Sequence, residues 1–329
     1  MKYFLRKFGF FLLTLWAVVT LNFLIPRVMP GDPAEIMVQN LAGKDAQLNP
    51  AQVQAMRDLL GTPEGSLISQ YGDYLGQLAN GNLGLSYNYF PFPVTQVIAQ
   101  AFWWTVILVT IVQVLSFIIG VLLGAFAAWR RNSRFDTVVT IGSTFIGTLN
   151  PAWIALLLLF GLGYSLGWFP TSGGYEESTP GFNWAFIYDA ISHAFLPALT
   201  LMILAPIGWV LGMRNTMIMD LSQDYIRLAK AKGLPDRTVA LRYAARNALL
   251  PSVTGFALAL GGVLGGAILV ETVFDYPGLG RLMGEAVSIK DYPLLQALML
   301  LSTAAVLVAN LIADLLYGVI DPRARRAEG

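Results

Sequence analysis

The chain has 329 residues, of which 56% are hydrophobic and 12% are charged, and its formal net charge is +1. Soluble domains carry about twice that share of charged residues, so the composition excludes an ordinary soluble protein. The absence of cysteine excludes disulfides and thiolate metal sites, and the near-neutral charge gives no sign of a nucleic-acid partner.

Six apolar runs in the sequence are long enough to cross a lipid bilayer as helices, which takes about 20 residues. They cover residues 9–28, 101–129, 137–166, 191–213, 250–273 and 293–320. The fourth run contains Pro197 and Pro206, which a membrane bundle tolerates where neighbouring groups satisfy the freed carbonyls. The sequence therefore predicts an all-α integral membrane protein with six transmembrane helices.

The first apolar run follows Lys2, Arg6 and Lys7, as the core of a signal peptide would. It is longer than such a core, however, and no small-residue cleavage site precedes Arg27, so we interpret residues 1–29 as an uncleaved first transmembrane helix.

Lysine and arginine are distributed unevenly between the loops on the two sides of the predicted helices. With the N-terminus in the cytoplasm, the loops on that side contain all of them except Arg27, Lys44, Arg57, Arg281 and Lys290. The positive-inside rule then predicts that both termini are cytoplasmic.

Residues 30–100 form a polar segment, expected on the external side. Asn49-Pro50 predicts the start of a short helix, which Gly61 ends, and an amphipathic helix is expected at about 67–78. The segment is either a lid that packs on the helix bundle or a docking surface for an extracytoplasmic solute-binding protein, and the sequence leaves both open.

The stretch Leu221–Pro251, which we call the elbow, is polar and basic and lies between two apolar runs. Ser222 is expected to cap the start of a first helix. Gly233 stands where a glycine typically ends a helix, and Pro235 prevents the helix from continuing.

A second helix is expected from about Asp236 to Leu250 in the elbow. It places Arg242 and Arg246 one turn apart on the same face. A polar helical elbow on the cytoplasmic side of a membrane protein indicates that something soluble docks there.

Motifs of catalysis are missing from the sequence. There is no G-x-x-x-x-G-K-[ST] loop, so the chain is not expected to hydrolyse ATP alone, and no G-x-S-x-G hydrolase motif. His193 lacks the partners of a metal site and is expected to be structural or interfacial. Glu271 and Asp314 fall within apolar runs, which by default suggests a function. Both stand near helix ends, where water or basic partners can reach them, and two isolated carboxylates make a poor proton relay.

Small residues spaced four apart allow close approach of helices in lipid. The pairs are Gly120/Gly124, Gly208/Gly212, Gly261/Gly265 and Gly262/Gly266. Packing is the expected role of these pairs. The glycine-rich fifth run is the candidate for lining a transport pathway between two subunits, through Gly255, Gly261, Gly262, Gly265 and Gly266.

Several blocks, in order along the whole chain, match one pattern: Pro30-Gly31-Asp32-Pro33-Ala34, Gly81–Ser86, Asp224–Pro251, Val270–Gly280, Asp291-Tyr292-Pro293 and Asp314–Arg323. Together they resemble permease subunits of ATP-driven importers, specifically the oligopeptide, dipeptide and nickel class. Asn82 replaces the usual Asp of its block, and the general E-A-A coupling motif is replaced by Arg227, Leu228 and Ala229.

The resemblance implies the type I importer permease fold in a bacterial or archaeal plasma membrane. Residues 101–321 are then the permease domain, with a coupling loop at 214–249 and a cytoplasmic tail at 322–329. The implied partners are a second related permease, two ATPase subunits that hold ATP and Mg²⁺, and an extracytoplasmic solute-binding protein, and this chain binds no cofactor. The residues implied to contact the ATPase are Asp224, Tyr225, Arg227, Ala229, Ala231, Lys232, Gly233, Leu234, Arg246, Asn247 and Pro251.

The substrate stays open between short peptides, which are the first choice for this class, oligosaccharides and nickel chelates. A stand-alone channel or ion-coupled transporter is the alternative from another class, and it predicts inverted repeats and paired charges at mid-membrane, which the sequence does not show. A membrane-bound enzyme lacks a catalytic cluster.

Overall fold

The computed structural model describes residues 2–28, 34–35, 38, 50–60, 66–176, 181, 183–265 and 267–320. The motif residues 30–33, Gly61, Gly266 and the tail 322–329 lie outside this part of the chain, and of Gly265 and Asp314 only the backbone is described. The described residues are helical apart from loops and an isolated bridge between Leu85 and Pro93.

The chain divides into two compact units. Unit 1 comprises Met1–Thr105, Leu264–Ile268 and Pro277–Leu311, and unit 2 comprises Val106–Val263, Leu269–Tyr276 and Ile312–Gly329. The long helix α5 (Val94–Trp129) begins in unit 1 and continues into unit 2.

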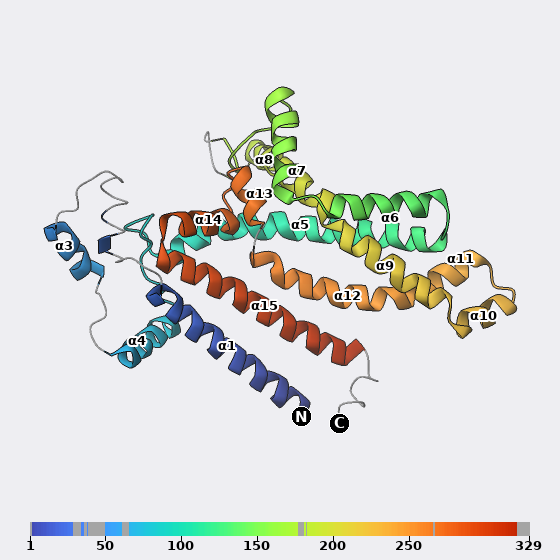
Figure 1. Cartoon of the computed structure of the whole chain (residues 1–329), viewed down its shortest axis with the longest axis horizontal. Helices are drawn as coiled ribbons and strands as arrows, with labels where there is room; N and C mark the ends of the chain where they lie inside the picture. The colour runs from blue at the N-terminus through green and yellow to red at the C-terminus, as the bar shows by residue number, and fades with distance from the viewer. Residues whose placement is uncertain are drawn as a thin grey trace. The chain divides into compact units, whose positions relative to one another are not determined.

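Unit 1 contains α1 (Lys2–Val28), α3 (Pro50–Leu60), α4 (Leu67–Ala79), α14 (Leu279–Ile289) and most of α15 (Tyr292–Ile320) (Figure 1). The predicted helix starting at Pro50 and the amphipathic helix after it are confirmed as α3 and α4. An apolar core joins the first turns of α5 to α14 and α15 through Val94, Val97, Ala101, Leu279, Leu282, Leu294 and Leu298.

Polar contacts fix α1 and α4 within unit 1. The side chains of Asn22 and Gln296 each donate to the other residue's carbonyl oxygen, at 2.9 and 2.6 Å, which joins α1 to α15. The hydroxyls of Thr20 and Tyr71 lie 2.7 Å apart and join α1 to α4.

The buried carboxylate of Asp291 anchors the segment before α5 to the start of α15. It accepts hydrogen bonds from the Ser86 hydroxyl, from the Asn88 amide at 3.0 Å and from the Leu294 amide at 3.2 Å. Three donors offset the cost of removing this carboxylate from water. The G-N-L-G-L-S block and the D-Y-P block of the sequence therefore meet at this buried carboxylate.

Unit 2 contains the later part of α5 and the remaining helices. These helices are α6 (Arg134–Gly147), α7 (Pro151–Leu158), the π-helical segment η1 (Leu159–Ser165), α8 (Trp184–Leu204), α9 (Pro206–Leu221), α10 (Asp224–Ala231), α11 (Asp236–Thr238), the π-helical segment η2 (Val239–Ala245), α12 (Arg246–Gly261), the 3₁₀ turn η3 (Gly262–Gly265) and α13 (Ile268–Val273). The exception is Leu264–Ile268, which includes the end of η3 and the first residue of α13 and belongs to unit 1.

Two of the predicted small residues bring α5 against α9. A Cβ added at Gly120 would lie 2.8 Å from the carbonyl oxygen of Pro206, and one at Gly124 would overlap the Val210 carbonyl oxygen. The pair Gly208/Gly212, in contrast, has no atom of the described residues within 4 Å of where a Cβ would stand, so the packing role of this pair stays a prediction.

The predicted membrane runs correspond to helices of differing regularity. Within the described residues, three helices are long and apolar enough to cross a membrane: α5, the joined pair α8–α9 (Trp184–Leu221) and α15 over Tyr292–Ile312. A fourth results if the bent pair Arg134–Gly147 and Pro151–Ser165 counts as one span. The first run forms α1, whose apolar part is the shorter Phe8–Leu24, and the fifth run is divided among α12, η3 and α13.

The third run bends by 96° between α6 and α7, which its unbroken apolar character did not predict. The physical cause is local, because a new helix starts at this point. Pro151 has no backbone N–H, and in the first turn of α7 an N–H would have no partner within the helix. The Asn150 side chain caps the same turn by accepting a hydrogen bond from the Ala152 amide at 2.9 Å.

Candidate functional site

The first helix of the elbow begins one residue later than predicted. α9 continues to Leu221, Ser222 ends it, and the Ser222 hydroxyl donates to the Met219 carbonyl at 2.7 Å. α10 begins at Asp224 with Gln223 as its capping residue, so the prediction that Ser222 caps this helix is wrong. Its hydroxyl instead satisfies a carbonyl of the last turn of α9.

Gly233 ends α10 as predicted. Its φ of +75° is a left-handed conformation that glycine adopts without penalty. The Leu234 amide donates to the Ala229 carbonyl at 3.3 Å and the Gly233 amide to the Lys230 carbonyl at 2.9 Å, which together form a Schellman motif. This turn directs the chain back toward α12.

The inner face of the elbow is a packed apolar core. Leu234 packs beside it, and its buried members come from α5, α9, α10, η2 and α12: Ala128, Met213, Met217, Ile226, Ala229, Val239, Ala240, Ala244 and Ala248. The elbow is therefore a folded element that is fixed to the end of α9.

The outer face of the elbow contains a polar groove of about 410 Å³ between α10 and the helix that follows. Its lining residues, which define the elbow groove, are Tyr225, Arg242, Tyr243, Arg246, Asn247 and Leu250. Inside it the Asn247 side-chain amide donates to the Tyr225 hydroxyl at 3.1 Å. Three predicted site residues, Tyr225, Arg246 and Asn247, are thus brought together, and Arg242 joins Arg246 as its spacing predicted.

The other predicted elbow residues lie elsewhere. Asp224 and Arg227 form an exposed ion pair at 3.4 Å. Ala231 and Lys232 are exposed beside the turn, and Pro251 lies inside α12. Ala229 and Leu234 belong to the inner face.

A buried ion pair that sequence reasoning missed fixes the helix that leads into the elbow. Arg214 on α9 binds the Asp136 carboxylate through both Nε and Nη2, the second at 3.0 Å, and Asp136 is 3% exposed. The Asn132 amide and the Thr140 hydroxyl also donate to this carboxylate, at 3.0 and 3.3 Å. Its only signal in the sequence is an acidic residue among the arginines that precede the third apolar run.

The carboxylate of Glu271, at the end of the fifth run, is fully buried. Of the two expectations, water does not reach this carboxylate, whereas contact with a basic partner stays a prediction. Burial, with the nearby charge of Glu271, raises the pKa of the Tyr276 phenol. His193 is also buried, and its Nδ1 lies 2.9 Å from the Asp189 carbonyl oxygen in the same helix, which is a structural contact.

The glycines proposed to line a pathway are not equivalent. A Cβ on Gly255 would lie 3.3 Å from the Trp209 ring, whereas one on Gly262 would meet open space. Gly261 is buried.

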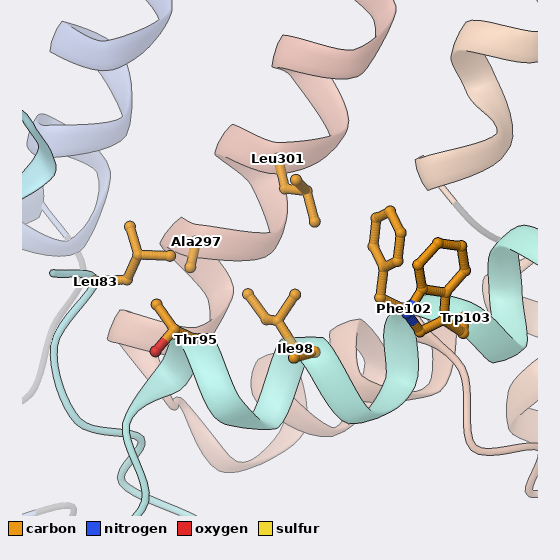
Figure 2. A pocket seen from close by; sticks show the side chains of 8 residues that line it. Leu83, Thr95, Ile98, Phe102, Trp103, Ala297 and Leu301 are labelled. Atoms are coloured by element: carbon orange, nitrogen blue, oxygen red, sulfur yellow. The ribbon is translucent and has the colours of Figure 1, made fainter. Parts of the chain in front are cut away.

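Unit 1 contains an apolar hollow of about 320 Å³ near the start of α5. Figure 2 shows Ile98, Phe102 and Trp103 of α5 and Leu301 of α15 around it, with Leu83 from the preceding turn.

Elsewhere in unit 1, the Tyr89 hydroxyl donates a hydrogen bond to the Glu285 carboxylate at 2.5 Å. Burial together with this hydrogen bond raises the pKa of Tyr89.

The sequence from residue 120 to 326 matches the family described as binding-protein-dependent transport system inner membrane component. The chain belongs to this family. It is thus a multi-pass inner-membrane component of a transport system that works with partner subunits, and its all-helical fold is that of a membrane permease.

Relatives of the same family match this chain over nearly its whole length. The oligopeptide transport system permease protein AppB of Bacillus subtilis is 36% identical, with 94% of both chains covered. The di/tripeptide transport system permease protein DppB of Pseudomonas aeruginosa is 34% identical, with 97% of both covered. The glutathione transport system permease protein GsiC of Escherichia coli is 36% identical, with 95% of both covered.

Proposed function

We propose that this chain is the permease subunit of an ATP-driven, binding-protein-dependent importer of short peptides, and that the elbow is where a separate ATPase subunit engages it. The observation that carries the proposal is the elbow itself: a folded helical turn with a packed inner face and a polar, arginine-bearing outer face, in a chain of this transport family.

The substrate class follows from the relatives. Those described above are permeases for an oligopeptide, for di- and tripeptides and for glutathione, which all contain peptide bonds. Peptides therefore precede oligosaccharides and nickel chelates as the proposed substrate.

The proposed topology has six crossings with both termini in the cytoplasm. The crossings are α1, α5, the bent α6–α7 pair with η1, α8–α9, the α12-to-α13 segment and α15. The proposed complex contains a second related permease, two ATPase subunits that bind ATP and Mg²⁺ and an external solute-binding protein, and this chain contributes no catalysis.

Transport in this proposal follows from movement of the elbow. Closure of the ATPase pair on ATP draws the two elbows together and favours an outward-open state, and hydrolysis restores the inward-open state. ATP can shift this equilibrium only by its different affinity for the two states. In this chain the elbow is packed on α9, and Arg214 joins α9 to α6, so displacement of the elbow would be transmitted to both helices.

The test is reconstitution of the chain with its partner permease, the ATPases and the binding protein in liposomes that contain no other transporter. Peptide uptake is expected to require ATPases that can hydrolyse ATP and to continue when an ionophore dissipates the proton gradient. Uptake by this chain alone, without ATP, would overturn the proposal and favour a channel, and loss of uptake with the gradient would favour an ion-coupled carrier.

A further inference from the structure

The elbow groove presents hydrogen-bond donors in excess. Arg242 and Arg246 are both exposed on its wall, and a guanidinium group donates but never accepts. The Tyr225 oxygen already accepts from Asn247, so its own hydroxyl hydrogen remains to be donated. An occupant that accepts, such as a carboxylate or a phosphate, satisfies these donors of Arg242, Arg246 and Tyr225.

The acidic residues of the elbow are engaged outside the groove. Its two acids, Asp224 and Asp236, form ion pairs with Arg227 at 3.4 Å and with Lys230 at 3.7 Å. No acidic residue lines the groove, and neither groove arginine has an ion-pair partner among the described residues. Two like charges about one helical turn apart repel each other until an anion lies between them.

We infer that the elbow groove is the binding site for an acidic side chain of the ATPase subunit, held between Arg242 and Arg246 with the Tyr225 hydroxyl as a third donor. This inference rests on the proposed function and names the chemistry of that contact. Arginine forks match carboxylates in two-bond geometry, and Tyr and Arg are the residues that most often dominate protein interfaces.

Position favours a protein carboxylate over a lipid phosphate. The groove wall includes Tyr225 on α10, the first helix of the elbow, and Figure 1 shows α10 and α11 beyond the ends of the long helices α9 and α12. A lipid headgroup beside the apolar run would reach Leu250 and the residues within one turn of it on α12, Arg246 and Asn247, but not the far wall of the groove at Tyr225 on α10. A soluble subunit that covers the elbow reaches the whole groove.

The first experiment measures how tightly the ATPase subunits bind the detergent-solubilised permease complex as salt is raised. Parental binding is expected to weaken with salt, because attraction between accessible charges is screened. The R242E and R246E variants are expected to bind about tenfold more weakly each and with a shallower salt dependence. R237E is the matched control, since Arg237 is an exposed arginine of the same elbow that does not line the groove.

The second experiment identifies the partner group. R242K and R246K place an amine in the groove, and a carbodiimide then joins that amine to a carboxylate in contact with it. Peptide mass spectrometry is expected to find positions 242 and 246 linked to the same acidic segment of the ATPase, and position 237 of an R237K control not linked to it. Links from position 237 to the same segment would contradict a specific site.

Lipid is tested by repeating the binding measurement in nanodiscs of phosphatidylcholine alone. Unchanged parental affinity supports a protein carboxylate, whereas affinity that returns only when phosphatidylglycerol is added would assign the groove to lipid and overturn the inference. If R242E and R246E bind as R237E does, the groove inference fails while the proposed function stands. If the parental complex does not bind the ATPases at all, the proposed function fails first.

Discussion

Asp136 carries a charge at a position with almost no access to water. Its carboxylate accepts hydrogen bonds from Nε and Nη2 of Arg214, from the Asn132 amide and from the Thr140 hydroxyl, so each oxygen has two donors. Breaking such a pair costs more than the pair contributes, because the Arg214 guanidinium is only 19% exposed and would lose the carboxylate that balances its charge.

We therefore expect Asp136→Ala to lower the free energy of unfolding by roughly 3 kcal/mol or more, since Arg214 keeps its charge. The melting temperature of the detergent-solubilised protein measures this. Arg131→Ala, at an exposed arginine of the same turn, is the control and should melt as the parent does. Equal melting of the two variants would show that the pair is not structural.

Gly124 allows α9 to pass close to α5. A methyl group there would overlap the Val210 carbonyl and stand 3.0 Å from the Met213 Cβ, and a backbone carbonyl cannot move away without moving α9. Gly124→Ala is expected to destabilise the protein by about 1–3 kcal/mol.

Gly142 on α6 is the matched control for this prediction. A Cβ there meets nothing within 4 Å, so Gly142→Ala should be neutral or stabilise by up to about 1 kcal/mol, because alanine loses less entropy in a helix. Thermal melts of the two variants should move in different directions, and a shift of the same sign and size would refute the packing role of Gly124.

At the scale of elements, the turn after α10 depends on one dihedral angle. Gly233 has φ of +75° and open space around it, so a side chain there meets strain without collision. Asparagine tolerates this conformation best and β-branched residues worst. We expect the rate of peptide-stimulated ATP hydrolysis by the reconstituted complex to be reduced least in Gly233→Asn, more in Gly233→Ala and most in Gly233→Val.

The subunits of these variants should still co-purify at least in part, because the inner face of the elbow is unchanged. Gly72→Val on α4, where the glycine has an ordinary helical conformation and open space, controls for adding the side chain itself. A Gly233→Val complex that transports at the parental rate would show that the elbow does not transmit the motion.

Local signals in the sequence predicted those elements whose causes are local. Gly233 ends α10 and Pro50 starts α3 because helix ends are determined by a few neighbouring residues. The bend at Asn150-Pro151 carried the same kind of signal, but it lay inside a continuous apolar run whose hydrophobicity pointed to one span.

Contacts distant in sequence were beyond prediction. Asp136 and Arg214 are 78 residues apart, and Ser86 and Asp291 are 205 apart. In the elbow groove, helical spacing predicted that Arg242 and Arg246 share a face, but only the fold of the turn brings Tyr225 to Asn247. The candidate residues could be named from the sequence, but which of them are in contact is determined by the tertiary structure.

At the scale of the whole molecule, the distribution of lysine and arginine predicts the orientation in the membrane. The chain has no cysteine, so a single cysteine can be placed at will and labelled without background. In the Lys232→Cys variant we expect no reaction with an impermeant thiol reagent in intact cells and full reaction after the membrane is opened. A cysteine replacing Asn88, an exposed residue of the predicted external segment, should react in intact cells, and labelling of position 232 from outside would reverse the topology.

The π-helical segment η2 gives the elbow a place where its length can change during evolution. A π turn accommodates one residue more than an α turn, so a one-residue insertion or deletion there leaves α10 and α12 intact. Arg242 lies inside this segment and Arg246 just after it, and a shift of one residue rotates a side chain by about 100° around the helix axis. In this chain, a one-residue deletion within η2 is therefore expected to change which side chains line the elbow groove.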